Sequence, residues 1–254
     1  MAKILIHKKR KETIEGKERV ISKFKKYYVA DLTRDFHCNE GVLKKNAFKK
    51  KQAKTNMGFT FSIFDAQFCD EYWRMTRGPQ TIPLKDIGVI IAITGLNKNS
   101  IVVDAGTGSG ALAIALANLV KEVHTYDILD EHLRIAKENI EKMKIKNCFI
   151  KKHDVTKSIP QKKVDVLILD LPDPYLVVKH AMKVLTSGGW FISYSPHVTQ
   201  VVDFCKEVEK QEDLFIVKTI ELIEREWDIE DRKARPKTQG IGHSGFLTFV
   251  RKIG

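Results

Sequence analysis

The sequence of 254 residues has little cysteine, and its cysteines are not arranged in pairs. Cys38, Cys69, Cys148 and Cys205 lie far apart, and no two of them have CxxC or metal-ligand spacing. This spacing argues against a zinc cluster and against a redox motif. We therefore expect ordinary thiols in a reducing compartment and no bound metal.

Long hydrophobic runs are also absent. The longest apolar stretch, around Val89–Ile93, is far too short to span a bilayer. The first ten residues, MAKILIHKKR, lack the apolar core of a signal peptide. No internal repeat or low-complexity segment is visible. These observations predict a cytoplasmic protein with no membrane partner, large enough for one large domain or for one domain plus a small one.

Positive charge is plentiful and unevenly distributed. The formal net charge is +12, and residues 1–75 hold 18 Lys or Arg against 9 Asp or Glu, so this third of the chain carries an excess of nine. A Lys-rich run is usually a solvated surface. A local excess of this size also suits a polyanion such as RNA. A membrane surface is a weaker alternative, because no basic amphipathic helix is evident.

The chain divides into two regions of different pattern. Residues 1–70 contain short β-type runs between Lys-rich turns, namely KILIHKK, KKYYVADL, GVLKK and GFTFSIF. They predict a small basic all-β domain whose aromatic residues are mostly core. Residues 71–254 alternate strands with helices of about 10–15 residues, after a helical stretch over 66–77 that links the two regions.

This alternation predicts an α/β fold with a Rossmann-like, mostly parallel, seven-stranded sheet. The expected strands cover 100–106, 122–128, 148–154, 164–170, 188–196, 214–229 and 245–252. No helix is predicted between the last two, so they should form a hairpin that contributes one antiparallel strand.

The segment VVDAGTGSGALAIALA is the strongest local motif. A buried strand ends at Asp104, the glycines Gly106, Gly108 and Gly110 form a turn, and a helix follows. Glycine allows positive φ and a close approach of a ligand to the backbone. The N–H groups at a helix N-terminus are free to bind a ligand.

Three further strands in this region also end in an acid. Asp127 ends the second strand, where it is placed to bind two ribose hydroxyls. Asp154 ends the third strand, placed for the adenine amino group, with Val155 against the ring. Asp170 ends the fourth strand in VLILDLPDP. In parallel sheets the ligand lies across the carboxyl ends of the strands, so four acids in phase indicate a site.

The glycine turn alone leaves two cofactors open. Gly106, Gly108 and Ala111 also fit the loose GxGxxG/A pattern of NAD-binding folds. Three features favour S-adenosylmethionine instead: an acid two residues before the first glycine, a module in front of the α/β unit, and the HDV ending of the third strand. Asp104 would orient the loop or meet the cofactor's ammonium through water.

The sequence resembles the archaeal tRNA (adenine-N1)-methyltransferases of the TrmI type. The resemblance covers nearly the whole chain and is carried by MTRGPQTIPLKDIG, VVDAGTGSGALAIALA, LDLPDP and GHSGFLTFVRK. It implies a class I methyltransferase that forms a homotetramer, uses S-adenosylmethionine, and modifies tRNA at T-loop adenosine 58, with 57 as a second target. One departure is Pro83-Leu84, where the family usually has Tyr-Pro.

The resemblance also implies roles for individual residues. Asp170 would be the catalytic carboxylate. The expected cofactor-binding residues are Gln80, Asp104, Gly106, Thr107, Gly108, Ser109, Gly110, Asp127, His132, Asp154, Val155 and Asp170 itself. Tyr194 is a further candidate for the target-base pocket, although core packing explains it as well. His243 is expected to have a structural role in a turn.

Asp170 suits the chemistry of this reaction. Attack by adenine N1 places positive charge on the ring and its exocyclic amino group, and a carboxylate at that group would stabilise the charge or remove a proton. The target base must leave its stack, and the basic N-terminal domain would hold the tRNA meanwhile. An NAD-dependent oxidoreductase and a non-catalytic tRNA-binding subunit are the alternatives, and the intact acids argue against the second.

Overall fold

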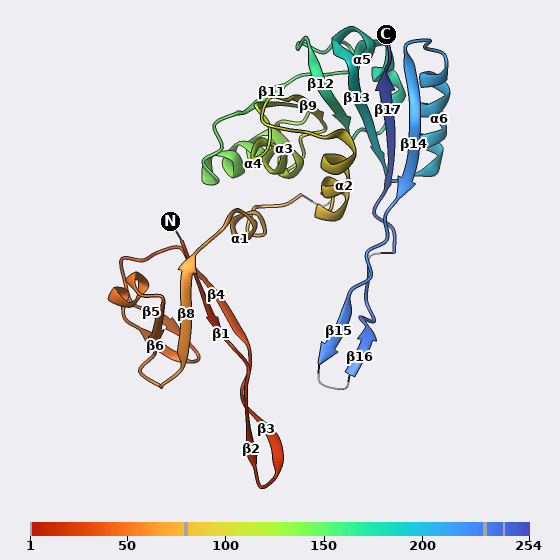
Figure 1. Ribbon diagram of the computed structural model, residues 1–254. Coiled ribbons are helices and arrows are strands. Elements are labelled where there is room, and N and C mark those ends of the chain that lie inside the picture. The colour runs from red at the N-terminus through yellow and green to blue at the C-terminus, as the bar shows by residue number, and fades with distance from the viewer. Residues whose placement is uncertain (1, 79–80, 231–232, 241) are drawn as a thin grey trace. The chain divides into compact units, whose positions relative to one another are not determined.

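The computed structural model describes residues 2–78, 81–230, 233–240 and 242–254. The chain forms two compact units, one up to Arg74 and one from Met75 onward (Figure 1). The boundary expected at residue 70 falls inside helix α1 (Phe68–Tyr72), and the division observed follows that helix.

The N-terminal unit is built around a four-stranded antiparallel sheet in the order β4-β1-β8-β7. Two smaller hairpins, β2–β3 and β5–β6, and a short 3-10 helix complete it. Its elements are β1 (Lys3–His7), β2 (Arg10–Ile14), β3 (Lys17–Ser22), β4 (Lys25–Val29), β5 (Phe36–Cys38), β6 (Gly41–Leu43), η1 (Lys45–Lys49), β7 (Gln52–Lys54), β8 (Thr60–Asp65) and α1.

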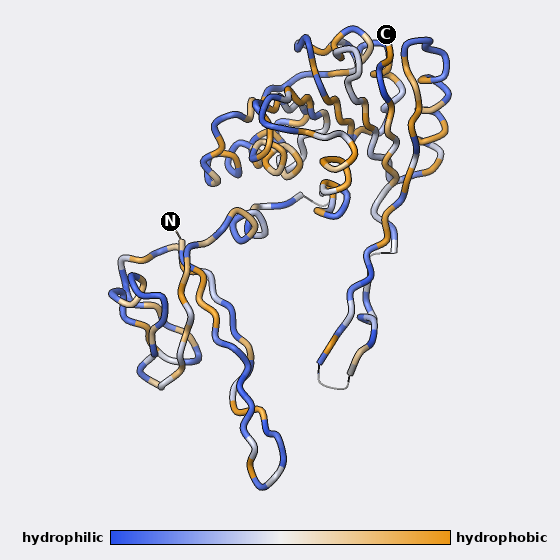
Figure 2. The backbone as a smooth tube through the Cα atoms, in the orientation of Figure 1, coloured by the Kyte–Doolittle hydropathy of each residue, from blue (hydrophilic) through white to orange (hydrophobic). Residues whose placement is uncertain are grey.

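The β2–β3 hairpin corrects one prediction from the sequence. Residues 10–24 are expected as a Lys-rich turn, yet they contain two paired strands around Glu15 and Gly16, which have positive φ. The strands RKETI and KERVIS are mostly exposed, so they carry no apolar alternation by which they could be recognised. Figure 2 shows this hairpin as one of the more hydrophilic parts of the chain.

The core of the N-terminal unit holds most of its aromatic residues, as expected. Phe48 and Phe61 are buried together with Leu5, Leu43 and Ile63. Tyr27 and Phe59 pack against this cluster, whereas Phe24 is exposed. Because the large rings supply the apolar area that a small sheet needs to bury, they are mostly unavailable for stacking on nucleic-acid bases.

The second unit contains the predicted seven-stranded sheet, in the order β11-β10-β9-β12-β13-β17-β14. Only β17 runs antiparallel to its neighbours. Its elements are α2 (Leu84–Thr94), β9 (Ile101–Ala105), α3 (Ala111–Ala117), β10 (Glu122–Asp127), α4 (Asp130–Lys142), β11 (Cys148–Lys152), β12 (Val164–Leu169), η2 (Pro174–Val177), α5 (Val178–Val184), β13 (Leu185–Ser195), α6 (Val198–Glu209), β14 (Leu214–Glu221), β15 (Trp227–Glu230), β16 (Lys233–Pro236) and β17 (Phe246–Lys252).

Helices cover both faces of this sheet, which is why its central strands are continuous apolar runs. On one face Leu167, Leu169 and Phe191 pack with Val178 of α5 and Phe204 of α6. Helices α2, α3 and α4 lie on the other face (Figure 1). Side chains alternate between the faces, and the carboxyl ends of β9, β10, β11 and β12 meet at one edge.

The C-terminal part differs from the prediction in two places. The strand expected over 214–229 breaks after Glu221, and Trp227–Glu230 and Lys233–Pro236 pair as a separate hairpin, β15–β16, which is inserted before β17. The helix expected over 175–186 begins as the 3-10 turn η2, and β13 already starts at Leu185. The helix expected over 66–77 is reduced to the five residues of α1.

Within the described residues, no helix is long and apolar enough to cross a membrane. The same residues contain no group of three or more His, Cys, Asp or Glu side chains that could hold a metal ion.

Candidate active site

The four strand-end acids lie at one edge of the sheet. Asp104 is the second-to-last residue of β9, Asp127 ends β10, Asp170 directly follows β12, and Asp154 comes two residues after β11. The parallel register brings these ends together, because Asp104 pairs with Thr125 and β12 runs beside β9. The sequence pattern therefore produces a shared edge of carboxylates.

The glycine turn contacts the loop that carries Asp170. Gly106 has φ +95°, and a Cβ placed there would lie 2.1 Å from the Asp170 carbonyl oxygen. The Asp170 N–H donates to the Ala105 carbonyl (2.8 Å), and the Gly106 N–H donates to the Tyr126 carbonyl (2.9 Å). Only glycine fits this position, since both its space and its φ exclude a side chain.

The end of the glycine turn, just before α3, packs closely against α4. Gly110 has φ +78° and precedes the helix, and a Cβ there would lie 3.1 Å from Cβ of Ala136 in α4. Gly108 has φ +51° and nothing closer to an added Cβ than 4.0 Å. The open space at Gly108 leaves the backbone accessible to a ligand, and Ser109 beside it is buried.

The Asp127 carboxylate is held by the glycine turn on one side and by the start of α4 on the other. Its Oδ2 accepts from the Gly108 N–H (3.1 Å) and lies 3.0 Å from Nδ1 of His132, while Oδ1 accepts from the Leu129 N–H (2.9 Å). A carboxylate has about four lone-pair positions, so this orientation still leaves capacity for a hydroxyl. His132 is thus placed beside Asp127, as predicted.

Asp104 is buried and only partly satisfied. The Thr125 hydroxyl donates to its Oδ2 (2.7 Å), and the Thr107 hydroxyl in turn donates to Thr125 (2.7 Å). Its Oδ1 has no partner among the described residues. Burial, and next the charges of Asp170 and Asp127, raise the pKa of Asp104 to about 7. A cation near Oδ1 would reverse this effect.

Asp170 has a similar electrostatic environment at a more accessible position. Burial first, and then the charge of Asp127, raise the pKa of Asp170 to about 6. The three carboxylates Asp104, Asp127 and Asp170 make the edge unfavourable for a pyrophosphate group and favourable for a cationic ligand. This charge favours a sulfonium cofactor over a dinucleotide.

Asp154 and Val155 lie at the far end of the edge. Val155 is buried, and Asp154 accepts from the backbone N–H (3.0 Å) and the hydroxyl (2.6 Å) of Thr156. These hydrogen bonds, with Lys157 nearby, lower the pKa of Asp154. The carboxylate therefore stays ionised while it also shapes the turn after β11.

Two overlapping cavities form a cleft along these strand ends. Their volumes are about 290 and 260 Å³, and both are lined by Gly106, Asp127, Ile128, Leu171 and Pro172. The first extends to Gly108, Ser109, His132 and Asp170, and the second to His153, Asp154, Val155 and Leu176. The cleft thus combines apolar walls with hydrogen-bonding groups, as small-molecule sites do.

The remaining two predicted residues are Gln80 and Tyr194. Gln80 lies outside the described residues. Tyr194 is buried in β13, its hydroxyl donates to the Ser244 carbonyl (2.5 Å), and a Cβ at Gly245 would lie 2.6 Å from its ring. Tyr194 therefore packs tightly against the segment before β17. Its surroundings, chiefly burial, raise its pKa to about 12, with Asp170 near enough to contribute.

Asn139 is a site residue that the sequence analysis missed. It is buried in α4, and its amide donates to the carbonyls of Ser109 (2.9 Å) and Thr76 (2.7 Å) while accepting from the Thr76 N–H (3.1 Å). It links the glycine turn to the MTRG segment that precedes α2. An Asn in mid-helix gives no signal of its own, because solvent-exposed helices contain it as well.

A second missed feature is a cluster around Lys85 and Asp86. Asp86 is fully buried, and the Lys85 ammonium lies 2.9 and 3.0 Å from its two oxygens. The ammonium also donates to the Leu222 carbonyl (2.8 Å) and the Ser244 hydroxyl (2.6 Å), which itself donates to Asp86 (2.9 Å). The Lys-Asp of the MTRGPQ…KD motif thus fastens α2 to the segments that follow β14 and precede β17.

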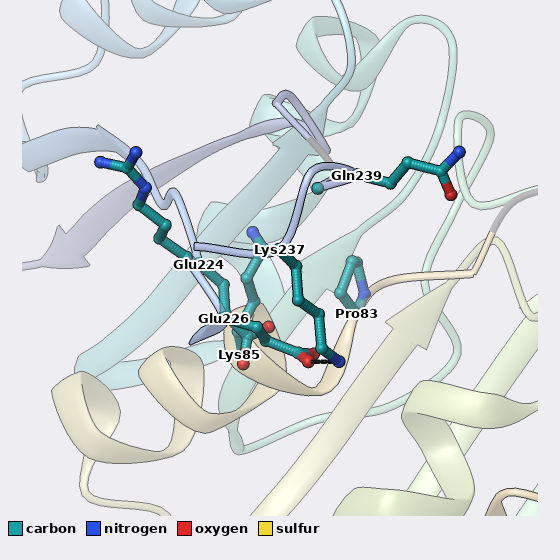
Figure 3. A pocket seen from close by; sticks show the side chains of 8 residues that line it. Pro83, Lys85, Glu224, Glu226, Lys237 and Gln239 are labelled. Atoms are coloured by element: carbon teal, nitrogen blue, oxygen red, sulfur yellow. Dashed lines mark hydrogen bonds and ion pairs between the residues drawn. The ribbon is translucent and has the colours of Figure 1, made fainter. Parts of the chain in front are cut away.

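A separate cavity of about 240 Å³ lies beside Lys85 and contains none of the strand-end acids. Figure 3 shows Lys237 paired with Glu226 within it, and Pro83 and Gln239 at its walls. Of its three cations, Lys85 is paired with Asp86 and Lys237 with Glu226, and Arg225 lies between Glu224 and Glu226 in the sequence, so the cavity offers no clear preference for a ligand of either charge.

The residues of the cleft fit S-adenosylmethionine. The glycine turn provides a backbone cradle that a Cβ at residue 106 would fill, Asp127 can accept from hydroxyls, and the unpartnered oxygen of Asp104 suits a cationic group. Ile128, Val155 and Leu171 supply apolar contacts for a flat ring. These are the donors and surfaces that an adenosine linked to a cationic amino acid requires.

Comparison with solved structures defines the class of fold. The chain matches a SAM-dependent O-methyltransferase of Thermotoga maritima with a TM-score of 0.78 and 23% identity, covering 100% of this chain and 93% of the other. It matches the tRNA (m1A58) methyltransferase TrmI of Aquifex aeolicus with a TM-score of 0.75 and 24% identity, over 99% and 97%. With its strand order and glycine turn, the second unit has the class I methyltransferase fold.

Sequence comparison then gives the family. Residues 63–235 match the family model described as the tRNA methyltransferase complex GCD14 subunit, and the chain belongs to this family. A Methanocaldococcus jannaschii protein named tRNA (adenine(57)-N(1)/adenine(58)-N(1))-methyltransferase TrmI is 34% identical over 258 residues, 89% of this chain and 91% of that protein. The Thermus thermophilus tRNA (adenine(58)-N(1))-methyltransferase TrmI is 25% identical over 226 residues, 85% and 88%.

Proposed function

We propose that this protein transfers a methyl group from S-adenosylmethionine to N1 of an adenosine in the T loop of tRNA. The observation that carries the proposal is the edge of three carboxylates beside the glycine turn, in a chain of this family. Position 58 is the target shared by the names of the two curated relatives, and position 57 is a second target in one of them.

The cofactor would lie in the cleft along the strand ends. Asp127 would accept from the ribose hydroxyls, Asp154 and Val155 would contact the adenine, and the turn from Thr107 to Gly110 would line the amino acid part. When bound, S-adenosylmethionine supplies an electrophilic methyl group. Asp104 would hold its charge opposite the cationic end, because its free oxygen needs a donor.

Asp170 would act on the target base. At neutral pH its carboxylate is mostly ionised, and it can accept a hydrogen bond from the exocyclic amino group of the adenine. As N1 gains a methyl group, positive charge spreads to that amino group and the hydrogen bond strengthens. The rigid Pro172 and Pro174 limit the conformations of the loop that carries Asp170.

The N-terminal unit would bind the tRNA. Its excess of nine positive charges suits phosphate contacts, which would offset the cost of unstacking the target base. Such a substrate would place the protein in the cytoplasm. The boundary at residue 74 would then separate an RNA-binding unit from a methyltransferase unit.

A homotetramer is the proposed assembly. Exposed apolar side chains are concentrated near the β15–β16 hairpin, where Ile223 is 71% exposed, Trp227 52% and Ile229 78%. Exposed residues of this kind often mark subunit contacts. Light scattering at several concentrations would give the mass, and a monomer at all of them would contradict the proposal.

A direct assay tests the activity. Unmodified tRNA transcripts are incubated with the protein and S-adenosylmethionine, and products are mapped by nuclease digestion and mass spectrometry. We expect 1-methyladenosine at position 58, and none in a transcript in which guanosine replaces adenosine 58 and adenosine 57 is absent. Tight binding of NAD without binding of S-adenosylhomocysteine would instead favour an oxidoreductase.

A further inference from the structure

His243 faces two hydrogen-bond acceptors at once. Its Nδ1 contacts a carboxylate oxygen of Glu221 at the end of β14, and its Nε2 lies 2.8 Å from the backbone carbonyl of Pro196, directly after β13. A neutral imidazole has one N–H and one lone pair, so it can satisfy only one of these acceptors. The geometry therefore requires the doubly protonated ring.

The charges around His243 support this cationic form. Glu221 on β14 and Lys85 at the start of α2 are the charged groups that face it, and the ring of Phe246 packs beside it with centroids 5.0 Å apart. The hydrogen bond to Glu221, and next that to Pro196, raise the pKa of His243 above 6.5, while Lys85 opposes them. His243 in its charged form thus ties the end of β13 to β14.

Gln200 continues this connection toward Asp170. It lies in the first turn of α6, which begins just after Pro196, and its Oε1 accepts from the His197 N–H (3.1 Å). Its Nε2 donates to the Pro172 carbonyl (2.8 Å). Pro172 is two residues from Asp170, so one amide holds both the start of the helix and the loop of the carboxylate.

We propose that Gln200 and His243 are positioning residues for Asp170. The imidazolium of His243 fixes the segment at Pro196, and Gln200, which that segment carries, fixes the loop through Pro172. Neither side chain needs to touch the reacting atoms. The proposal rests on the proposed function, since Asp170 must act on the base, and displacement of such a group by about 1 Å can slow a reaction roughly 10²-fold.

The first test separates the two hydrogen bonds of Gln200. Gln200→Glu keeps the size and the acceptor for the His197 N–H, and an acid suits the first turn of a helix. An ionised carboxylate cannot donate to Pro172, however. We expect the single-turnover rate of tRNA methylation to fall at least tenfold. Affinity for S-adenosylhomocysteine and for tRNA should stay within twofold, and the variant should stay folded.

Gln211→Glu is the matched control. It makes the same charge change just past the other end of α6 and should keep the wild-type rate. If Gln200→Glu also keeps that rate, the inference is wrong. If the wild-type protein methylates no tRNA at all, the proposed function is wrong, and the two failures are therefore distinguishable.

The second test uses the pH profile. Loss of a proton from His243 removes one of its two contacts, so the wild-type single-turnover rate should fall on the alkaline side, at a pH above 6.5. His243→Gln should have a lower rate without that fall. Glu221→Gln, which removes the charged acceptor but keeps the ring, should move the fall to lower pH. An unchanged alkaline side in both variants would overturn the role of His243.

Discussion

Asp170 occupies a position where its protonation state should control the rate. A protonated carboxyl has no negative charge with which to stabilise the positive charge that develops on the exocyclic amino group, so the wild-type rate should fall as the pH drops through about 6. Asp170→Asn should reduce the single-turnover rate by roughly 10²–10³ and remove this acidic fall. Calorimetry should show that the variant still binds S-adenosylhomocysteine, and a rate within tenfold of wild type would contradict the role.

Comparing Gly106 with Gly108 distinguishes the cost of an added side chain's volume from the cost of the backbone conformation. Both have positive φ, but only a Cβ at residue 106 meets a backbone atom, the Asp170 carbonyl at 2.1 Å. Gly106→Ala should therefore prevent normal packing of the site and lower the free energy of unfolding by more than about 3 kcal/mol. Gly108→Ala should lose only about 1–2 kcal/mol, the cost of the left-handed conformation.

Urea denaturation of both glycine variants gives this comparison directly. The Gly108 variant should stay folded while it binds S-adenosylhomocysteine less tightly, because its added methyl group faces the open side of the turn. Equal losses of stability in the two variants would show that the close approach of residue 106 to the Asp170 carbonyl adds nothing to the cost of the left-handed conformation.

Asp104 should make the stability of the ligand-free protein depend on pH. Its folded-state pKa of about 7 lies above its ordinary value of 3.8, so the folded state holds the proton more tightly than the unfolded state. Stability from this group is complete below pH 4 and is lost as the pH rises through about 7. Asp104→Asn should remove a loss of roughly 4 kcal/mol between these limits.

Thermal unfolding of wild type and Asp104→Asn at pH 4.5 and pH 8 provides the measurement. The variant should gain on the wild type at the higher pH, and the same variant should bind S-adenosylmethionine less tightly because its free oxygen has lost its charge. A stability difference that is constant with pH would contradict the raised pKa.

Helix α2 depends on one ion pair for its connection to the end of the sheet. The Lys85 ammonium contacts the buried Asp86, the Leu222 carbonyl and the Ser244 hydroxyl. Lys85→Ala would leave the Asp86 carboxylate buried without its cation and should cost roughly 3–5 kcal/mol of stability. Because the partners are coupled, Lys85→Ala combined with Asp86→Ala should cost less than the sum of the single changes.

Equilibrium denaturation of the two single variants and the double variant completes this cycle. Asp165→Ala is a useful comparison, since its carboxylate accepts one hydrogen bond from the Ile101 N–H (2.8 Å) at the opposite end of the strands. It should lose far less than Lys85→Ala. Strict additivity of the Lys85 and Asp86 changes would show that the pair is not a unit.

The elements that sequence reasoning found are those with a strong apolar pattern. The runs Ile101–Ala105 and Val164–Leu169 are buried on both faces, so their existence and the acids at their ends were predictable. The β2–β3 and β15–β16 hairpins were missed, because exposed two-stranded ribbons need no apolar period. Asn139, Lys85 and Gln200 were assigned no role, since the partners that connect them to other elements lie 28 to 159 positions away.

At the scale of the whole molecule, the two units differ in charge, because the N-terminal unit carries nine of the twelve net positive charges. The run Lys49–Lys51 is exposed in the N-terminal unit and offers three adjacent cations. Replacing all three by Gln should weaken tRNA binding and reduce the slope of log K against log salt by roughly 2–3. Binding of S-adenosylhomocysteine should not change.

Filter binding at several salt concentrations measures this slope. The control replaces Lys137, Lys146 and Lys206, three exposed lysines of the second unit, by Gln. It removes the same total charge and should change the slope much less. Equal effects of the two triple variants would mean that general charge, and not the N-terminal unit, determines tRNA binding.

The place of β17 in the sheet has a consequence for biosynthesis. This strand is synthesised after the other six strands of the sheet, yet it pairs with β13 on one side and β14 on the other. While the ribosome is still adding it, β14 has no neighbour to join, and neither His243 nor Ser244 can reach its partners. At about 5–20 residues per second, the nascent chain would complete its cofactor edge seconds before the segment that holds Asp170 in place. The site would thus be complete only once β17 has entered the sheet between β13 and β14, which are both synthesised before it.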